Sequence, residues 1–184
     1  NLFETRLEKE LLGEQTMYAR ELRSDSKVMI RITHLLRALV DEQVPLTNPQ
    51  QIITGLLAAQ PCEDFHEKVA CLRQHLREVL PGNQSADFTY MRLSPDLENR
   101  LSQNLQMSNR EPLSSLSLVD LSNDVREAFN KIPSNEKVTL IVGHPRLRFH
   151  IRRLTQSTHP MLMLLAYNEL IAPLSSKFKD IPIL

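Results

Sequence analysis

The side chains that could hold a metal ion are six histidines and two cysteines, and they are spread along the chain. A structural zinc site usually needs about four ligands at short spacings, and neither Cys62 nor Cys71 has a C-x-x-C partner. Only Cys71 and His75 share a helix face by i, i+4 spacing, with His66 nearby in sequence. We assign these side chains to packing or surface roles, and we predict no metal site.

The turn Gly143-His144-Pro145 lies between an expected strand and an expected helix, a position that phosphate-binding turns occupy in other folds. One glycine is far fewer than a G-x-G-x-x-G or Walker loop requires, and the chain has only four glycines. No G-x-S-x-G nucleophile elbow is present either. We therefore predict a plain turn, no catalytic residue and no cofactor. A small enzyme built on the Gly143 turn stays open as an alternative.

An arginine-rich segment follows this turn and has two interpretations. Its basic residues are His144, Arg146, Arg148, His150, Arg152 and Arg153. Arg148 and Arg152 share a face by i, i+4 spacing, while Leu147, Ile151 and Leu154 are expected to point inward. The face could contact an acidic protein or an anion, a role in which arginine is favoured. The simpler interpretation, which we favour, is a solvated face with a partner such as Glu169.

Residues 1 to about 81 are expected to be entirely helical. Leu2–Arg23 is charged and amphipathic, and a second helix follows a serine cap at position 24 or 26. The expected inward residues of this second helix are Val28, Ile32, Leu35, Leu36, Leu39 and Val40. A third helix starts at Asn48-Pro49, with Ile52, Ile53, Leu56 and Leu57 as its apolar face. A fourth is expected over Glu63–Leu80, with Val69, Leu72, Leu76 and Val79 inward.

The polar, turn-rich stretch Pro81–Asp87 is the best candidate for a boundary. Beyond it, the pattern predicts a strand at 88–93, a helix from Pro95 to Met107, a helix at 118–132, a strand at 137–142, a helix at 145–156 and a strand at 161–165. The last three form a βαβ unit, whose strands are nearly always parallel. We therefore predict an α+β protein, with a helical subdomain at 1–84 and a small α/β subdomain at 85–184.

Charge and hydropathy exclude some classes of function. Lys+Arg and Asp+Glu both total 22, so the formal net charge is zero, whereas nucleic-acid binders usually carry a basic excess. A regulator that uses Ile30–Leu57 as a helix-turn-helix and Arg146–Arg153 as a phosphate contact remains the main alternative. We find no apolar run of about 18 residues in the sequence. Two reduced thiols suit a cytosolic compartment, and the helical start without Met suggests a piece of a longer protein.

The order of motifs resembles a known family. A strand, then P-R-L-R-F-H-I-R-R-L at 145–154, then an apolar strand and Y-N-E-L at 167–170 resemble the C-terminal end of the export-gate proteins of bacterial type III secretion. These are the FlhA family of flagella and the SctV (InvA, MxiA, LcrD) family of injectisomes. Glu4-Thr5-Arg6, the segment at 32–44 and L-S-P-D-L-E at 93–98 match in the same order. The chain departs from the pattern at Leu46-Thr47-Asn48 and at Ala166, and it looks closer to the injectisome branch.

The resemblance implies a function in protein export and virulence. The parent protein would have an N-terminal transmembrane region in the bacterial inner membrane and four cytoplasmic subdomains, of which this chain would be the third and fourth. The cytoplasmic part would assemble into a nonameric ring. It would dock chaperone–substrate complexes, a gatekeeper protein and other export-apparatus proteins. It would perform no catalysis and bind no nucleic acid, and it would contact the membrane only through its missing N-terminal region.

From charge and expected exposure, we select five residues for contact with a partner or with a ring neighbour. Two groups supply them. They are Arg37, Asp41 and Glu42 on the helical part, and Arg148 and Arg152 on the arginine-rich helix.

Overall fold

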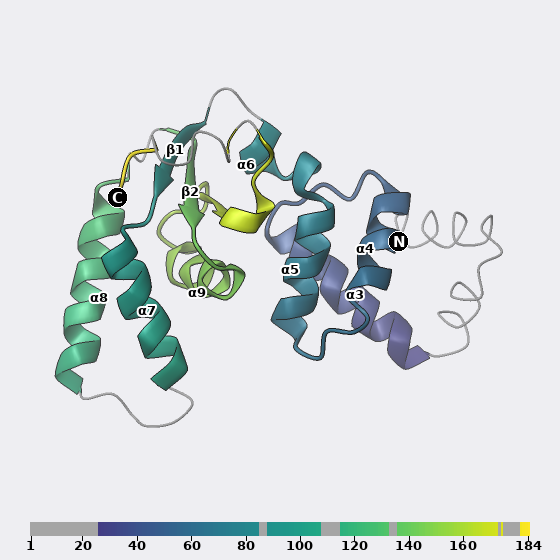
Figure 1. Cartoon of the computed structure of the whole chain (residues 1–184), viewed down its shortest axis with the longest axis horizontal. Coiled ribbons are helices and arrows are strands. Elements are labelled where there is room, and N and C mark those ends of the chain that lie inside the picture. The colour runs from purple at the N-terminus through teal and green to yellow at the C-terminus, as the bar shows by residue number, and fades with distance from the viewer. Residues whose placement is uncertain (1–25, 85–87, 108–114, 133–135, 173, 175–180) are drawn as a thin grey trace. The chain divides into compact units, whose positions relative to one another are not determined.

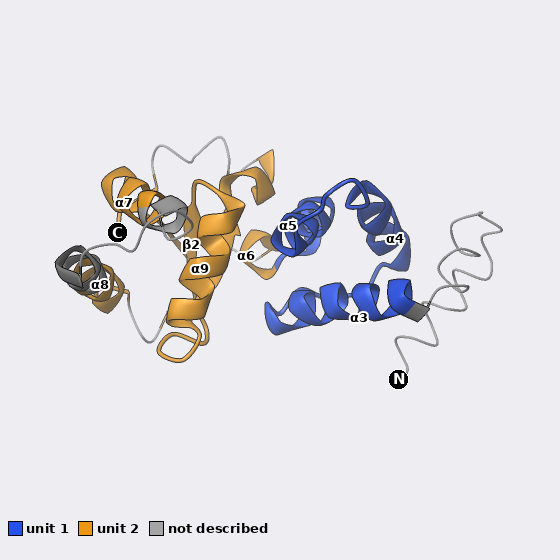
Figure 2. Ribbon diagram, turned by 90° about the horizontal axis from the view of Figure 1, so that it is seen from below, with its two compact units in different colours: residues 1–80 blue, residues 81–184 orange. Residues whose placement is uncertain are grey.

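A computed structural model describes residues 26–84, 88–107, 115–132, 136–172, 174 and 181–184 (Figure 1). The expected helix Leu2–Arg23 and the motif at 4–6 lie outside these residues. The chain divides into two compact units, residues 1–80 and 81–184 (Figure 2). The expected boundary lay between residues 84 and 85. The observed division falls earlier because the short helix α6 (Pro81–Gln84) contacts β3 of the second unit.

The first described helix of unit 1, α3 (Ser26–Asp41), buries an apolar stripe, as its 3.6-residue period predicts. Its buried residues are Ile32, Leu35, Leu36 and Leu39. Val40 was expected inside but is 56% exposed, because it lies at the margin of the stripe. The helix ends in a Schellman motif, in which the Val44 N–H donates to Leu39 O (2.9 Å) and the Gln43 N–H to Val40 O (2.8 Å). Gln43 adopts φ 60°, the left-handed conformation that this motif requires.

The helices α4 (Pro49–Ala58) and α5 (Phe65–His75) pack together within unit 1. α4 begins as predicted, because Asn48 Oδ1 accepts from the Gln51 N–H and Pro49 occupies the first turn. Gly55 allows close approach to α5, since a Cβ at this position would lie 3.0 Å from Leu72 Cδ2. Leu57 was expected inside but is exposed.

The expected single helix over Glu63–Leu80 is shorter and divided. α5 begins only at Phe65, because Asp64 Oδ1 accepts from the N–H groups of His66 (2.6 Å) and Glu67 (3.1 Å). It ends at His75, and a separate 3₁₀ turn, η1 (Arg77–Val79), follows. The turn at Pro81–Gln84 is also not the plain loop that was expected, since these residues form α6.

Unit 2 is built on a parallel sheet in the order β1 (Thr89–Arg92), β2 (Val138–Val142), β3 (Met163–Ala166). The register pairs Met91 with Leu140 and Leu140 with Leu164. The sequence expectation of parallel strands in a βαβ unit is confirmed. All five residues of β2 are buried, as expected for the central strand of a sheet covered on both faces.

Besides α6, unit 2 contains the longer helices α7 (Pro95–Met107), α8 (Ser115–Asn130) and α9 (Pro145–Thr155), and a 3₁₀ turn, η2 (Tyr167–Glu169), follows β3. One apolar core joins these three helices to one face of the sheet, including Val138, Leu140 and Val142. On α8, the expected inward residues Val125, Ala128 and Phe129 are buried, whereas the side chain of Leu121 lies outside the description. The other face of β2 contacts α6, because a Cβ at Gly82 would lie 3.0 Å from Thr139. The predicted α+β class is confirmed.

Candidate interaction surfaces

The first site residue, Arg148, lies inside unit 2 rather than on its surface. α9 starts with His144 as its cap, whose Nδ1 accepts from the Arg146 N–H at 3.2 Å, and Arg148 follows within the first turn. The Arg148 side chain is 2% exposed, and its Nε lies 3.4 Å from Oε1 of Glu169, which is 0% exposed. The exposure from which we predicted a contact role for Arg148 is therefore absent.

Glu169 holds the turn that closes β3. Its Oε2 accepts from the Ala166 N–H at 3.0 Å, and its own carbonyl accepts from Nδ2 of Asn83 at 2.8 Å. Together with the Arg148 contact, these bonds join α6, η2 and α9 through one buried residue, Glu169. Glu169 does pair with an arginine of α9, as expected, but the pair is buried and not on a solvated face, while the side chain of the neighbouring Tyr167 is exposed.

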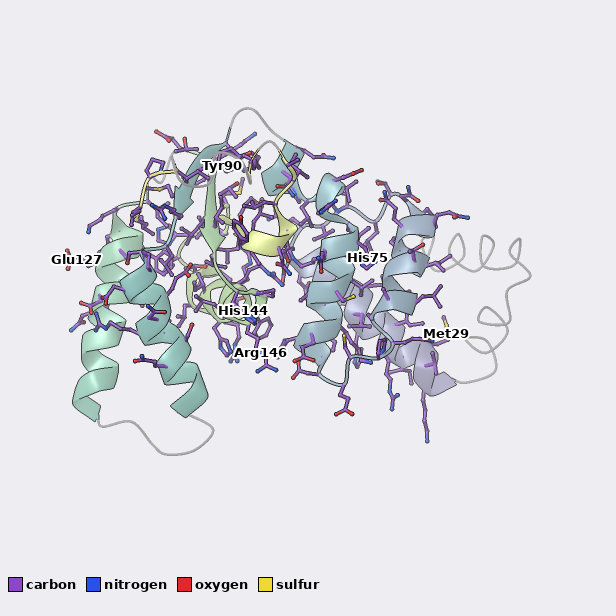
Figure 3. The ribbon with its side chains drawn as sticks, in the orientation of Figure 1. Met29, His75, Tyr90, Glu127, His144 and Arg146 are labelled. Atoms are coloured by element: carbon purple, nitrogen blue, oxygen red, sulfur yellow. The ribbon has the colours of Figure 1, made fainter. Side chains whose placement is uncertain are left out.

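Arg152 is half-buried, and its Nη1 donates to Leu162 O at 3.0 Å, which ties α9 to the segment before β3. The outward cations of α9 are instead Arg146 and Arg153 (Figure 3 labels Arg146). The sequence contained a signal for this arrangement. Arg148 and Arg152 lie on the same face of α9 as the apolar Ile151. Their i, i+4 spacing therefore indicated that both arginine side chains are directed inward. Leu154 was expected inside but is exposed.

On unit 1, the structure separates the three predicted contact residues. Arg37 and Asp41 are exposed on α3, four residues apart and therefore on the same face. Glu42 is largely buried, and its Oε2 lies 2.8 Å from Nη1 of the buried Arg73 on α5. Sequence inspection did not select Arg73. Its position directly after the buried Leu72 gave no sign that it points inward.

Apolar side chains lie beside these exposed charges. Ile30 and Val40 are both more than half exposed on α3. Ile30, Arg37 and Asp41 follow i, i+7, i+11 spacing, so they share one side of the helix, and Val40 borders it. We call these four residues the α3 outer face. This face offers a partner aliphatic area together with charges of opposite sign.

The Gly143 turn is already occupied by a carboxylate of the chain itself. The Gly143 N–H donates to Oε1 of Glu98 at 2.8 Å, and a Cβ at Gly143 would lie only 2.6 Å from Oε2. Burial raises the pKa of the Glu98 carboxyl, while the Gly143 bond and Arg92 lower it. An anion at this turn would have to displace Glu98, so this arrangement counts against a phosphate-binding enzyme.

The two thiols are free and half-buried. Cys62 precedes the start of α5, whereas Cys71 lies on that helix. Burial raises the pKa of the Cys71 thiol, and the charge of Cys62 raises it further. Nδ1 of His75 lies 4.0 Å from Cys71 Sγ and 2.9 Å from its carbonyl oxygen. Within the described ranges, no group of three or more His, Cys, Asp or Glu could hold a metal ion.

Two further features bear on the alternatives. The segment Glu42–Asn48 between α3 and α4 exceeds the roughly three- to four-residue turn of a helix-turn-helix, and α4 carries no Lys or Arg for phosphate contacts. These features count against DNA binding through Ile30–Leu57. Separately, no helix in the described part of the chain is long and apolar enough to cross a membrane.

Comparisons with known proteins agree with the motif order. The chain matches the FHIPEP family over residues 5–174. A search of curated protein sequences gave no match. Among solved structures, the C-terminal domain of InvA has a TM-score of 0.71 at 15% identity, covering 98% of this chain and 54% of that one. Nonameric SctV-C from EPEC has a TM-score of 0.70 at 17% identity, covering 100% and 55%.

A third solved structure, the Chlamydia pneumoniae CdsV and CdsO protein complex, has a TM-score of 0.56 at 18% identity, covering 96% of this chain and 52% of that one. The chain thus spans about half the length of each of these structures. At 15–18% identity, the solved structures show only that the fold is similar. Membership of a family is shown by the family match. The chain therefore belongs to the FHIPEP family, the type III secretion export-gate family that its sequence resembles.

Proposed function

We propose that this chain is part of the cytoplasmic region of an inner-membrane export gate for type III protein secretion. It takes part in ring assembly and in docking of chaperone, substrate and gatekeeper proteins, and it catalyses no reaction. The observation that carries the proposal is the family match over residues 5–174. The fold shared with SctV-C, which was solved as a nonamer, supports the ring. Units 1 and 2 would be the third and fourth cytoplasmic subdomains.

The α3 outer face is the best-supported surface for a ring neighbour. Arg37 and Asp41 are exposed there alongside Ile30 and Val40, so charged and aliphatic groups are available together. Aliphatic area supplies affinity, and the opposite charges supply register and specificity. Glu42 acts by fixing the end of α3 through Arg73 rather than by touching a partner.

We assign the docking of soluble export partners to unit 2. Arg146 and Arg153 are the exposed cations of α9, and Tyr167 is an exposed aromatic on η2. Arg and Tyr are enriched where proteins bind one another. The complex of CdsV with CdsO shows that a protein of this fold can hold a second protein. The partners we propose here are chaperone–substrate complexes and the gatekeeper.

A binding experiment tests the docking role. The cytoplasmic region containing this chain would be immobilised, and purified chaperone–substrate complexes and gatekeeper from the same organism would be passed over it. We expect saturable binding that weakens in Arg146→Glu/Arg153→Glu, with the exposed Arg126→Glu on α8 as the matched control. Absence of binding by every partner, with the fold intact by circular dichroism, would remove the docking role.

A further inference from the structure

Residues Ile181–Leu184 extend the sheet of unit 2 at its β1 edge. Ile183 forms a parallel bridge with Arg92, and Figure 1 shows this segment, in yellow, beside β1. The sheet order β1-β2-β3 leaves β1 at one edge. The segment is far from β1 in sequence, so it adds to the edge as a separate piece of chain.

One residue, Arg92, makes three hydrogen bonds to the added segment. Its N–H donates to Pro182 O at 2.9 Å, and its carbonyl accepts from the Leu184 N–H at 2.8 Å. Its Nε donates to Ile181 O at 3.0 Å. Each of these bonds ends on the main chain of the added segment, so none of them depends on which side chains that segment carries. Pro182 fits because the pairing uses its carbonyl and not the N–H that proline lacks.

Apolar contacts fix the ends of the added segment. Ile181 is buried, and Leu184 is half-buried against the apolar core of unit 2. Between them, Ile183 is 52% exposed. The site therefore accepts aliphatic side chains at the positions of Ile181 and Leu184 and tolerates a side chain in solvent at the position of Ile183.

We propose that the β1 edge at Arg92 is a strand-addition site for an extended, uncharged aliphatic segment of a partner protein, and that residues 181–184 occupy it in this structure. Main-chain bonds supply affinity and the two apolar positions supply selectivity, as in other cases of β-strand addition. The sequence Ile-Pro-Ile-Leu at 181–184 indicates what kind of segment the site binds. We expect a segment that runs parallel to β1, carries no charge and can have proline at its second position. Because the chain's own segment is tethered, a partner must compete with a high effective concentration.

The test uses the full chain with its own segment detached by Ile181→Asp/Leu184→Asp. The probe is the capped, uncharged peptide acetyl-Ile-Pro-Ile-Leu-amide. We expect the Arg92 amide to exchange hydrogen about tenfold faster in the variant, and saturating peptide to restore its protection. The control peptide carries an N-methyl group on its leucine, which removes the donor to Arg92 O, and it should restore nothing.

Two outcomes would overturn the proposal: protection that the peptide fails to restore, or equal rescue by the N-methylated control. If the double variant does not fold, Leu184→Ser keeps Ile181 in place and should show the same rescue by the same peptide. A negative result with this milder variant would also overturn the site. The site does not involve α3, so its failure would leave the proposed ring role untouched, and failure of ring assembly would not affect the peptide test.

Discussion

Glu169 shows why a charged residue in a family motif need not touch a partner. Its carboxylate is fully buried, receives the Ala166 N–H and faces the Arg148 guanidinium. A buried carboxylate without such partners would be strongly unfavourable. At the scale of single residues, the Y-N-E-L motif therefore forms the turn that ends β3, and within this motif the side chain of Tyr167 is exposed.

Arg148→Met tests this buried pair. It leaves the Glu169 carboxylate buried without its cation, so we expect a loss of about 3–5 kcal/mol in the unfolding free energy of unit 2. Adding Glu169→Gln removes the stranded charge and keeps an acceptor for the Ala166 N–H, so the double variant should recover part of the loss. Urea denaturation of the four proteins of this cycle measures the coupling. A loss below about 1 kcal/mol in the single variant would contradict a structural role for the pair.

Gln43→Gly should stabilise unit 1. Gln43 is held at φ 60°, where a side chain is unfavourable and glycine is not. We expect a gain of about 0.5–1 kcal/mol in unfolding free energy, measured by thermal and urea unfolding. Gln60→Gly is the matched control, since Gln43 is the sole non-glycine residue with positive φ among those described. The control should lose stability, and a loss at both positions would argue against the Schellman ending of α3.

Glu98→Gln should flatten the pH dependence of stability. Burial raises the pKa of Glu98 in the folded chain, so the folded state holds its proton more tightly than the unfolded state. Stability therefore falls as pH rises from the ordinary glutamate pKa through the raised one, and the cost is complete above that window. The variant keeps an acceptor for the Gly143 N–H and lacks this cost, so it should be at least as stable at pH 7. A steeper acid-side dependence in the variant, by denaturation across pH 4–8, would count against the account.

At the scale of elements, local signals predicted most of the secondary structure. Caps and prolines set the starts of α4, α7 and α9, and all three began where the sequence indicated. Burial at the margins of helices was harder to predict. Val40 and Leu57 extend an apolar pattern but remain exposed, because burial depends on which helix packs alongside. The addition of residues 181–184 to β1 rests on distant main-chain pairing, so periodicity could not reveal it.

Gly55→Ala tests the packing of α4 on α5. In an exposed helix this change would stabilise by about 1 kcal/mol. Here the new Cβ would lie 3.0 Å from Leu72 and 3.3 Å from His75 Cβ, so the helices must separate slightly. We expect a net loss of about 1 kcal/mol in the unfolding free energy of unit 1, since overpacking costs about 1–3 kcal/mol. Thr54→Ala, at the exposed neighbouring position, is the control and should not destabilise. A more stable Gly55→Ala variant would show that the helices are not in close contact.

At the scale of the whole molecule, motif order predicted more than any single site did. The family follows from segments spread over residues 5–174, whereas the five predicted contact residues came from charge and expected exposure. The structure leaves Arg37 and Asp41 exposed and turns Glu42 and Arg148 inward. Charge and spacing could not make that distinction, because each buried ion is paired with a residue distant in sequence.

Charge reversal on the α3 outer face tests the proposed ring contact. Arg37→Glu/Asp41→Arg replaces both exposed charges and leaves the buried Glu42–Arg73 pair in place. We expect about a tenfold or greater loss in self-association of the cytoplasmic region, since interface charges set register and exclude mismatched partners. Sedimentation velocity would measure it, with Arg126→Glu as the matched control.

Electron microscopy of the complete protein's cytoplasmic region, at high concentration, tests the central claim most directly. The proposed ring role, supported by the fold shared with nonameric SctV-C, predicts closed nonameric rings that are lost in Arg37→Glu/Asp41→Arg and kept in Arg126→Glu. Weak subunit contacts make assembly depend on concentration, so the measurement must span a wide range. Particles that stay monomeric at every concentration would contradict the account.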